Sequence, residues 1–259
     1  MLRLRNLGSG SSGNATLIEG RGGIHTTRLL VDCGLGIRHL GQRLGAAGLA
    51  PDDLDAIFIT HEHADHIGCA QALALRHRIP VWMSHGTHVA LGAPDFDGLL
   101  QIAHDLQPIA LGAIELRPFT VPHDAREPLQ LRCSDGALHL GVLTDLGHAS
   151  SHVIEQLQGC HALMLESNHD PELLAQSRYP EFLKRRVGGR YGHLANAAAA
   201  ALAQRLQHPG LRWVVAAHLS ERNNRPELAR AGLAAALGWE PQQIHVADPV
   251  TGTDWLDIQ

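Results

Sequence analysis

A short histidine-rich motif constrains the fold of this chain more than any other feature. Residues 60–66 read THEHADH and follow a short apolar run. Three imidazoles and one carboxylate therefore stand close together after a predicted buried strand. His61 and His63 can share one metal ion, while Asp65 and His66 can point toward a second. Oxygen and nitrogen donors without cysteine suit zinc first, with manganese or iron as alternatives.

Further donors stand where other predicted strands end. The strand before residue 122 is followed by His123, the strand before 145 by Asp145, and the strand before 218 by His218. Asp145 can bridge two ions with its two oxygens. Two ions about 3.5–4 Å apart can share a hydroxide and neutralise charge that develops during its attack. The chain holds 19 histidines, so a polar loop with scattered histidines is the alternative, and the ordered downstream donors argue against it.

Composition limits the class of protein. With 259 residues, 44% hydrophobic and 18% charged, the chain has an ordinary globular composition. No linker or repeat divides it, so we expect one domain over residues 1–259. The sequence contains no apolar run long enough for a membrane span, and its start lacks the apolar region of a secretory signal. Four scattered cysteines without a CxxC pair predict buried free thiols and a cytoplasmic location (Cys33, Cys69, Cys133 and Cys160).

The hydrophobic pattern predicts a mixed α/β chain. Strands are expected near residues 2–6, 14–19, 28–32, 56–59, 80–84, 114–121, 129–134, 138–144, 162–165, 213–217 and 244–247. Helices are expected near residues 37–47, 67–76, 151–158, 180–187, 194–207 and 226–238. Residues 85–107 give no clear pattern. Their histidines are interpreted as surface residues, with a loop over the site as the alternative. Hairpins with helices before and after them favour two mixed sheets packed face to face and covered by helices.

The His-x-His-x-Asp-His motif, followed by a distant His, Asp and His, resembles the metallo-β-lactamase fold along essentially the whole chain. The resemblance implies an αββα sandwich with a dinuclear site at one edge. It implies that one ion is held by His61, His63 and His123. The other is held by Asp65, His66 and His218, and Asp145 lies between the two ions.

Several other segments resemble the bacterial YycJ/WalJ-like group and, more loosely, the phosphodiesterase PhnP. They are residues 10–15, 30–34, 123–125, 166–170, 192–196 and 218–220. Members of that group are regarded as metal-dependent phosphodiesterases or 5'-to-3' DNA exonucleases. Their Gly-His-Leu-Ser-Asn motif has Ala195 in place of the serine here, which removes one hydroxyl contact.

Phosphodiester cleavage needs a nucleophile, charge neutralisation and a proton for the leaving group. A bridging hydroxide would supply the first and the ions the second. His193, just before the helix expected at residue 194, is the candidate for the third. Asp65 is the other candidate catalytic residue, because it would bind one of the two ions. A helix-cap or surface histidine is the alternative for His193.

Candidate substrate-binding residues lie in three polar segments. The Gly/Ser-rich loop after the first strand can approach an anion through Ser11, Ser12 and Asn14, although a plain turn is the alternative. Arg190 follows three further basic residues that can clamp phosphates or form a solvated helix face. Asn223, after His218, can line a groove. Three more polar residues are expected to orient the ligands from behind (Asp32, Glu166 and His169).

The sequence therefore predicts a dinuclear metal-dependent hydrolase acting on nucleic acid or a small phosphodiester, most simply an exonuclease. The formal net charge of −5 counts against a high-affinity DNA binder without excluding a nuclease. A glyoxalase II-like thioesterase or a lactonase is the alternative, because the same hydroxide can attack a carbonyl. A redox di-iron relative is disfavoured by His63, where such relatives typically carry glutamate. A binding module without activity is disfavoured by the complete donor set.

Overall fold

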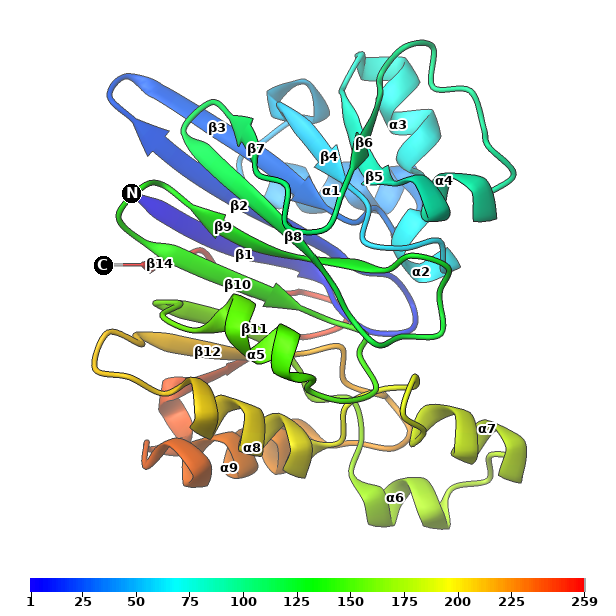
Figure 1. Ribbon diagram of the computed structural model, residues 1–259, viewed down its shortest axis with the longest axis vertical. Coiled ribbons are helices and arrows are strands. Elements are labelled where there is room, and N and C mark those ends of the chain that lie inside the picture. Colours follow the sequence, from blue (N-terminus) through cyan, green and yellow to red (C-terminus); the bar gives the residue numbers. More distant parts are fainter. Residues whose placement is uncertain (259) are drawn as a thin grey trace.

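Two seven-stranded β-sheets form the centre of the molecule in the computed structural model, which describes residues 1–258 (Figure 1). The first sheet has the order β14 (Leu256–Ile258), β1 (Leu2–Gly8), β2 (Ala15–Gly22), β3 (His25–Val31), β4 (Ala56–Phe58), β5 (Val81–Ser84) and β6 (Leu100–Ala103). The second has the order β13 (Ile244–Val246), β12 (Trp213–Ala217), β11 (Ala162–Glu166), β10 (His139–Leu143), β9 (Leu129–Ser134), β8 (Ile114–Thr120) and β7 (Ile109–Leu111). Both sheets contain parallel and antiparallel pairs.

The helices lie mainly in the connections between strands. Along the chain they are α1 (Ile37–Ala46), α2 (Ala64–Ile67), α3 (Ala70–His77), α4 (His85–Ala90), α5 (Ser151–Leu157), α6 (Pro171–Gln176), α7 (Glu181–Val187), α8 (Asn196–Leu206) and α9 (Pro226–Leu237). Two short 3-10 turns precede β4 and β13 (Pro51–Asp53 and Pro241–Gln243).

Alternating apolar residues pack the sheets against each other. In β3, Leu29 and Val31 belong to the core between the two sheets, while Leu30 lies in the core on the outer side. In β12, Val215 faces the inner core and Val214 the outer one. Because successive side chains of a strand point to opposite faces, both faces of each sheet are buried.

Helices cover the outer face of each sheet. Leu40 and Leu44 of α1 and Leu73 of α3 pack with the outer residues of the first sheet. Leu202 of α8 and Leu233 of α9 pack with those of the second. Figure 1 shows α8 and α9 at the bottom and α3 at the top right. The predicted αββα sandwich is thus confirmed.

Strand direction brings the donor-bearing loops together. In the second sheet β10, β11 and β12 are parallel, and β8 runs the same way because it is antiparallel to β9, as β10 is. In the first sheet β3 and β4 are parallel. The segments that follow β3, β4, β8, β10 and β12 carry every predicted ion ligand together with Asp32, and Glu166 is the last residue of β11. These strand ends meet at one edge of the sandwich.

The expected helix over residues 67–76 was wrong, because the segment divides into α2 and α3. Gly68 adopts φ +30° between them, and a Cβ on it would overlap the Cys33 carbonyl oxygen. This close approach fixes the end of the histidine motif against the end of β3. The structure also contains five short elements that the pattern did not predict (α4, β6, β7, α6 and β14).

The remaining general expectations concern cysteines and membrane spans. Cys33, Cys133 and Cys160 are buried and Cys69 is half-buried, and all four are free thiols. Over residues 1–258, every helix is too short or too polar to cross a bilayer.

Helix α8 begins at Asn196 rather than at the predicted residue 194, and it starts without a side-chain cap. Ala195 holds the N-cap position with extended backbone angles, φ −69° and ψ 154°, and its methyl group accepts no hydrogen bond. A serine with these angles would accept a hydrogen bond from a backbone N–H of the first turn. The missing hydroxyl noted in the sequence is therefore a missing helix cap.

We expect Ala195→Ser to raise the free energy of unfolding by about 0.5–2 kcal/mol, measured by urea denaturation. Ala197→Ser is the matched control, because the same change at an exposed position inside α8 should lower stability by about 0.5 kcal/mol or less. Equal effects of the two substitutions would contradict the capping explanation.

Candidate metal centre

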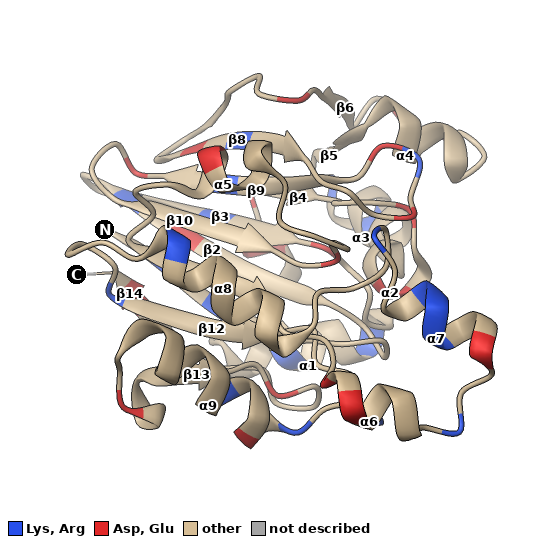
Figure 2. Ribbon diagram, turned by 60° about the horizontal axis from the view of Figure 1, so that its bottom comes forward, with Lys and Arg blue, Asp and Glu red and all other residues tan. Residues whose placement is uncertain are grey.

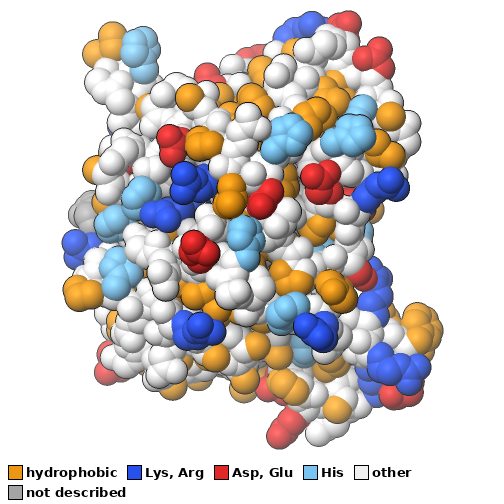
Figure 3. All heavy atoms as spheres, viewed as in Figure 1, with side chains coloured by type: hydrophobic (Ala, Val, Ile, Leu, Met, Phe, Trp, Pro, Cys, Tyr) orange, Lys and Arg blue, Asp and Glu red, His pale blue; other side chains and the backbone are white. Residues whose placement is uncertain are grey.

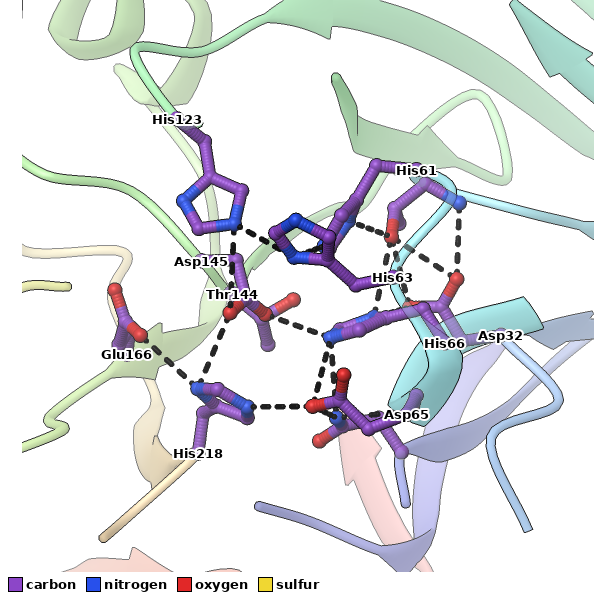
Figure 4. Close-up of polar contacts among 12 residues, drawn as sticks. Asp32, His61, His63, Asp65, His66, His123, Thr144, Asp145, Glu166 and His218 are labelled. Atoms are coloured by element: carbon purple, nitrogen blue, oxygen red, sulfur yellow. Dashed lines mark hydrogen bonds and ion pairs between the residues drawn. The ribbon is translucent and has the colours of Figure 1, made fainter. Parts of the chain in front are cut away.

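Three polar residues at strand ends adopt left-handed backbone angles. Asp32 follows β3 with φ 63°, Asp145 follows β10 with φ 54°, and His218 follows β12 with φ 54°. Side chains with a Cβ rarely adopt this region, and each such residue costs about 1–3 kcal/mol. All three side chains turn into the same cluster of imidazoles and carboxylates (Figure 4). The strained turns therefore direct these side chains into the cluster.

Three ring nitrogens form a first donor group. His61 Nε2 lies 3.0 Å from His63 Nδ1, and His123 Nε2 lies 3.3 Å from the same atom. Bonds of about 2.0–2.1 Å from a tetrahedral zinc ion would separate its nitrogen ligands by about 3.3 Å. The spacing of the three nitrogens therefore fits one divalent ion.

The hydrogen bonds behind these rings set where the protons lie. The Gly192 carbonyl can only accept, so His123 Nδ1–H donates to it over 3.1 Å. Thr60 Oγ1 donates to Asp32 and lies 3.0 Å from His61 Nδ1, from which it accepts. In the neutral rings both Nε2 atoms then carry lone pairs, and these face His63. A cation among the three nitrogens would bind both lone pairs, whereas an N–H on His63 Nδ1 could pair with only one of them.

A second donor group contains Asp65, His66 and His218. Asp65 Oδ2 lies 3.6 Å from His66 Nε2 and 3.5 Å from His218 Nε2. Asp32 Oδ2 accepts from His66 Nδ1 over 2.8 Å, and Glu166 Oε1 accepts from His218 Nδ1 over 3.0 Å. These two carboxylates leave each Nε2 free to bind a cation. Asp32 and Glu166 thus orient ligands, as predicted.

Asp145 lies between the two groups. Its Oδ2 is 3.0 Å from His66 Nε2, and its Oδ1 is 4.0 Å from His123 Nε2. The residue is 1% exposed, and Oδ2 receives no well-aligned hydrogen bond. A buried carboxylate oxygen without such a donor is unusual unless a cation binds it. The whole donor set therefore fits two divalent cations with Asp145 between them.

Burial and neighbouring charges shift the pKa values of the cluster in opposite directions. Burial lowers the pKa of His61 and of His123, which keeps both rings neutral. Burial works against the charged forms of Asp145 and His218 too, but here their mutual attraction prevails. The pKa of Asp145 lies well below its usual range, and that of His218 is raised to about 9.

His193 is held beside this cluster by Glu166. Its Nδ1 lies 2.8 Å from Glu166 Oε1, and its ring centroid lies 5.4 Å from that of His123 and 5.2 Å from that of His218. Glu166 Oε2 accepts from two backbone N–H groups, at Leu146 and at residue 194, both over 2.9 Å. Burial lowers the pKa of His193, yet Glu166 and Asp145 outweigh it and raise this pKa well above its usual value. His193 lies three residues before the first residue of α8, so Glu166 and not the helix start positions it.

The cluster opens to solvent on one side only. The side chains of His63, Asp65 and His193 are 27%, 24% and 22% exposed, whereas those of His61 and His66 are buried. A substrate can therefore reach the donor groups between His63, Asp65 and His193.

Asp124 is a polar residue of this open side that the sequence interpretation did not assign to the site. Its Oδ1 lies 3.4 Å from His123 Nε2, and its Oδ2 accepts from Arg186 Nε over 2.6 Å. Burial raises the pKa of the Asp124 carboxyl, but Arg186 and His123 outweigh it and lower the pKa overall. Its position directly after His123 was the available signal.

The five predicted substrate-binding residues have different positions. Ser11 and Ser12 are exposed and line a cavity with Tyr179 and Ser220. Arg190 is also exposed, near the open side.

Two of the five are corrections. Asn14 is 4% exposed, and its Nδ2 lies 3.3 Å from Asp65 Oδ2 and 3.1 Å from His66 Nε2, so it contacts two candidate donor atoms from within the protein. Asn223 is fully buried and its amide donates to Ser220 Oγ, so it does not line a groove. Their local sequence did not reveal that the chain folds over both residues.

His169 is a third correction, because its hydrogen-bonding contacts to the site are made by the backbone alone. The ring is buried and its Nδ1 has no partner, while its carbonyl accepts from the Asn196 N–H over 2.9 Å. Asn168, its neighbour, donates instead to the His218 carbonyl over 2.9 Å. The side chain that contacts His218 is therefore that of Asn168, one residue before the predicted His169.

Comparisons with known proteins agree with this arrangement. The sequence model of the metallo-beta-lactamase superfamily matches residues 8–164. Exodeoxyribonuclease YycJ of Bacillus anthracis is 33% identical over 254 residues, covering 94% of this chain and 94% of YycJ. Exodeoxyribonuclease WalJ of Streptococcus pneumoniae is 30% identical over 254 residues, covering 96% of this chain and 90% of WalJ. The solved structure of Zn(2+)-bound PqqB from Methylobacterium extorquens shares the fold, with a TM-score of 0.76 at 14% identity over 99% of this chain and 100% of that one.

We expect Asp32→Asn to weaken binding of the ion at Asp65, His66 and His218 about 10–100-fold. The amide NH₂ group that replaces one carboxylate oxygen cannot accept a hydrogen bond from His66 Nδ1–H. Asparagine tolerates the left-handed backbone, so the turn itself should persist. Calorimetric zinc titration of the stripped protein measures the effect. Asp52→Asn is the matched control, because Asp52 also accepts from a histidine, His77 Nδ1, but at the exposed surface. Unchanged affinity for both ions in Asp32→Asn would contradict the role of Asp32.

Proposed function

The chain belongs to the metallo-beta-lactamase superfamily, and from this premise we propose that it is a dinuclear metal-dependent phosphodiesterase, an exodeoxyribonuclease that digests DNA from 5' to 3'. The observation that carries the proposal is the His193–Glu166 pair beside two groups of ion donors. The exodeoxyribonuclease relatives, aligned over more than 90% of their length, support it. We assign zinc to both ion sites, with manganese and iron sharing the same donor types.

The donor groups fit the chemistry of phosphodiester cleavage. Two bound divalent ions would neutralise charge on the phosphoryl oxygens and lower the pKa of a bound water. The first ion would be held by His61, His63 and His123, the second by Asp65, His66 and His218, with Asp145 between them. The protein contributes rigid ligands, because carboxylates, a hydroxyl or a carbonyl fix four of the five imidazoles from behind.

His193 supplies a proton to the leaving group in this proposal. Its Nδ1–H donates to Glu166, so the transferable proton sits on Nε2, the nitrogen turned away from that contact. An alkoxide leaving group needs such an acid far more than a thiolate does. The pair therefore favours a phosphodiester over a thioester, one of the two competing substrate classes.

Hydrolysis of four substrates by the zinc-loaded protein tests the proposal. The substrates are bis-p-nitrophenyl phosphate, a thioester, a lactone and DNA labelled at either end. We expect turnover of the first and of DNA, with mononucleotides released from the 5' end, and loss of activity after chelation. Activity on the thioester or the lactone alone would overturn the proposal.

We expect His193→Ala to retain both ions while kcat on DNA falls about 10²–10⁴-fold, because the leaving group loses its proton donor. Metal analysis of the purified variant and steady-state kinetics measure the two quantities. His104→Ala, at an exposed histidine, is the control and should turn over normally. A His193→Ala variant that keeps its ions and its kcat would show that another group supplies the proton.

A further inference from the structure

A basic segment, residues 178–191, forms the edge of the molecule next to the metal centre. It includes α7, and Figure 1 shows α7 projecting at the lower right. Figure 2 shows blue ribbon on the same helix. The segment carries five basic residues and one acidic residue, in a chain whose formal net charge is −5 (Arg178, Lys184, Arg185, Arg186 and Arg190; Glu181). Positive charge is therefore concentrated here against the overall charge of the protein.

The same segment exposes aromatic rings. It contains both tyrosines of the chain, Tyr179 and Tyr191. Tyr191 is 59% exposed and Phe182 is 67% exposed, which is uncommon for side chains of this size. Figure 3 shows basic and hydrophobic side chains next to each other on this projection at the lower right. A merely solvated helix face would not present these rings among its charges.

Backbone contacts fix the end of the segment at the metal centre. The Tyr191 carbonyl accepts from the Asp124 N–H over 2.9 Å, and the Arg190 carbonyl accepts from His148 Nδ1 over 2.9 Å. The next residue, Gly192, accepts from the candidate ligand His123. The exposed Tyr191 ring is thus tied through its backbone to the loops that carry His123 and Asp145.

The start of the segment borders a cavity on the Gly/Ser-rich loop. Six residues line this cavity of about 290 Å³ (Ser11, Ser12, Tyr179, Ser220, Glu221 and Arg222). The Arg222 guanidinium lies 5.9 Å from the centroid of the Tyr179 ring. An aromatic ring, a cation, three serine hydroxyl groups and the Glu221 carboxylate therefore meet at this end.

The cations of the segment are not equally available. Arg186 pairs with Asp124 over 2.6 Å, and Lys184 pairs with Glu181 over 3.3 Å. The exposed side chains of Arg185 and Arg190 make no ion pair with any acidic group in residues 1–258. These two arginines are therefore available to an external anion.

We infer that the basic segment binds single-stranded polynucleotide on its way to the metal centre, with Tyr191 stacked on an unpaired base and with Arg185 and Arg190 neutralising phosphates. This inference rests on the proposed nuclease function and extends it from one phosphodiester to the polymer around it. Aromatic rings alternating with cations are the usual means of holding single strands, because every base offers a face for stacking. A duplex offers no such face except at its ends.

Oligonucleotide binding by the zinc-loaded protein tests the inference. The probe is a fluorescein-labelled phosphorothioate oligodeoxythymidylate, which resists cleavage, and Kd is read from fluorescence anisotropy. We expect Tyr191→Ala to raise Kd about tenfold, since stacking contributes that order of affinity per base. Tyr191→Phe keeps the ring and should bind like the unmodified protein. Turnover of bis-p-nitrophenyl phosphate should be unchanged in both variants, because neither substitution alters a candidate ion ligand or His193.

The arginines are tested by salt dependence. Arg185→Ala and Arg190→Ala should each weaken binding and reduce the slope of log Kd against log salt by about 0.7. Arg205→Ala, at an exposed arginine of α8, is the matched control and should change neither quantity. The tyrosine effect should disappear on a closed circular duplex, which has no terminal base face.

Three results would overturn the inference. They are unchanged oligonucleotide affinity in Tyr191→Ala, equal losses in Tyr191→Phe and Tyr191→Ala, or an equal loss on the closed circular duplex. Failure of the nuclease proposal has a different signature, because the unmodified protein would then cleave neither phosphodiester. Binding of the phosphorothioate probe would still report on the segment in that case.

Discussion

The buried carboxylate of Asp145 lies between two groups of imidazoles, and the rest of the centre is arranged around that charge. An anion with 1% exposure is costly in a protein interior unless cations or donors compensate it. His66, His193, His218 and His123 all approach it within 4.0 Å. The outer carboxylates Asp32 and Glu166 face those rings from the other side. The result is a layered array in which anions and imidazoles alternate, and divalent cations would complete the balance.

Forming this array costs folding free energy, which the rest of the fold must offset. Strained turns at residues 32, 145 and 218 act against folding, and so does the burial of three carboxylates. The apolar cores on both faces of each sheet oppose these costs, and they hold the strand ends in register. Ions that bind only the folded chain would add stability by mass action. The site and the sandwich are therefore linked energetically as well as geometrically.

Much of the fold and of the ligand set could be predicted from the sequence because the signals were local. The histidine motif places four donors in one loop, and His123, Asp145 and His218 each follow an apolar strand. Contacts between distant segments could not be predicted in this way. The burial of Asn14 and Asn223, the break at Gly68 and the pairing of Asp124 with Arg186 all depend on which backbone packs against which. The start of α8 at Asn196 was missed for a local reason, because its N-cap residue is an alanine and carries no side chain that marks a helix start.

Anomalous diffraction at the zinc absorption edge, from crystals of the zinc-loaded protein, tests the central claim most directly. We predict two peaks about 3.5–4 Å apart, one among His61, His63 and His123 and one among Asp65, His66 and His218, with Asp145 in contact with both. A single peak, peaks elsewhere on the protein, or rings of these residues turned away from the peaks would contradict the account.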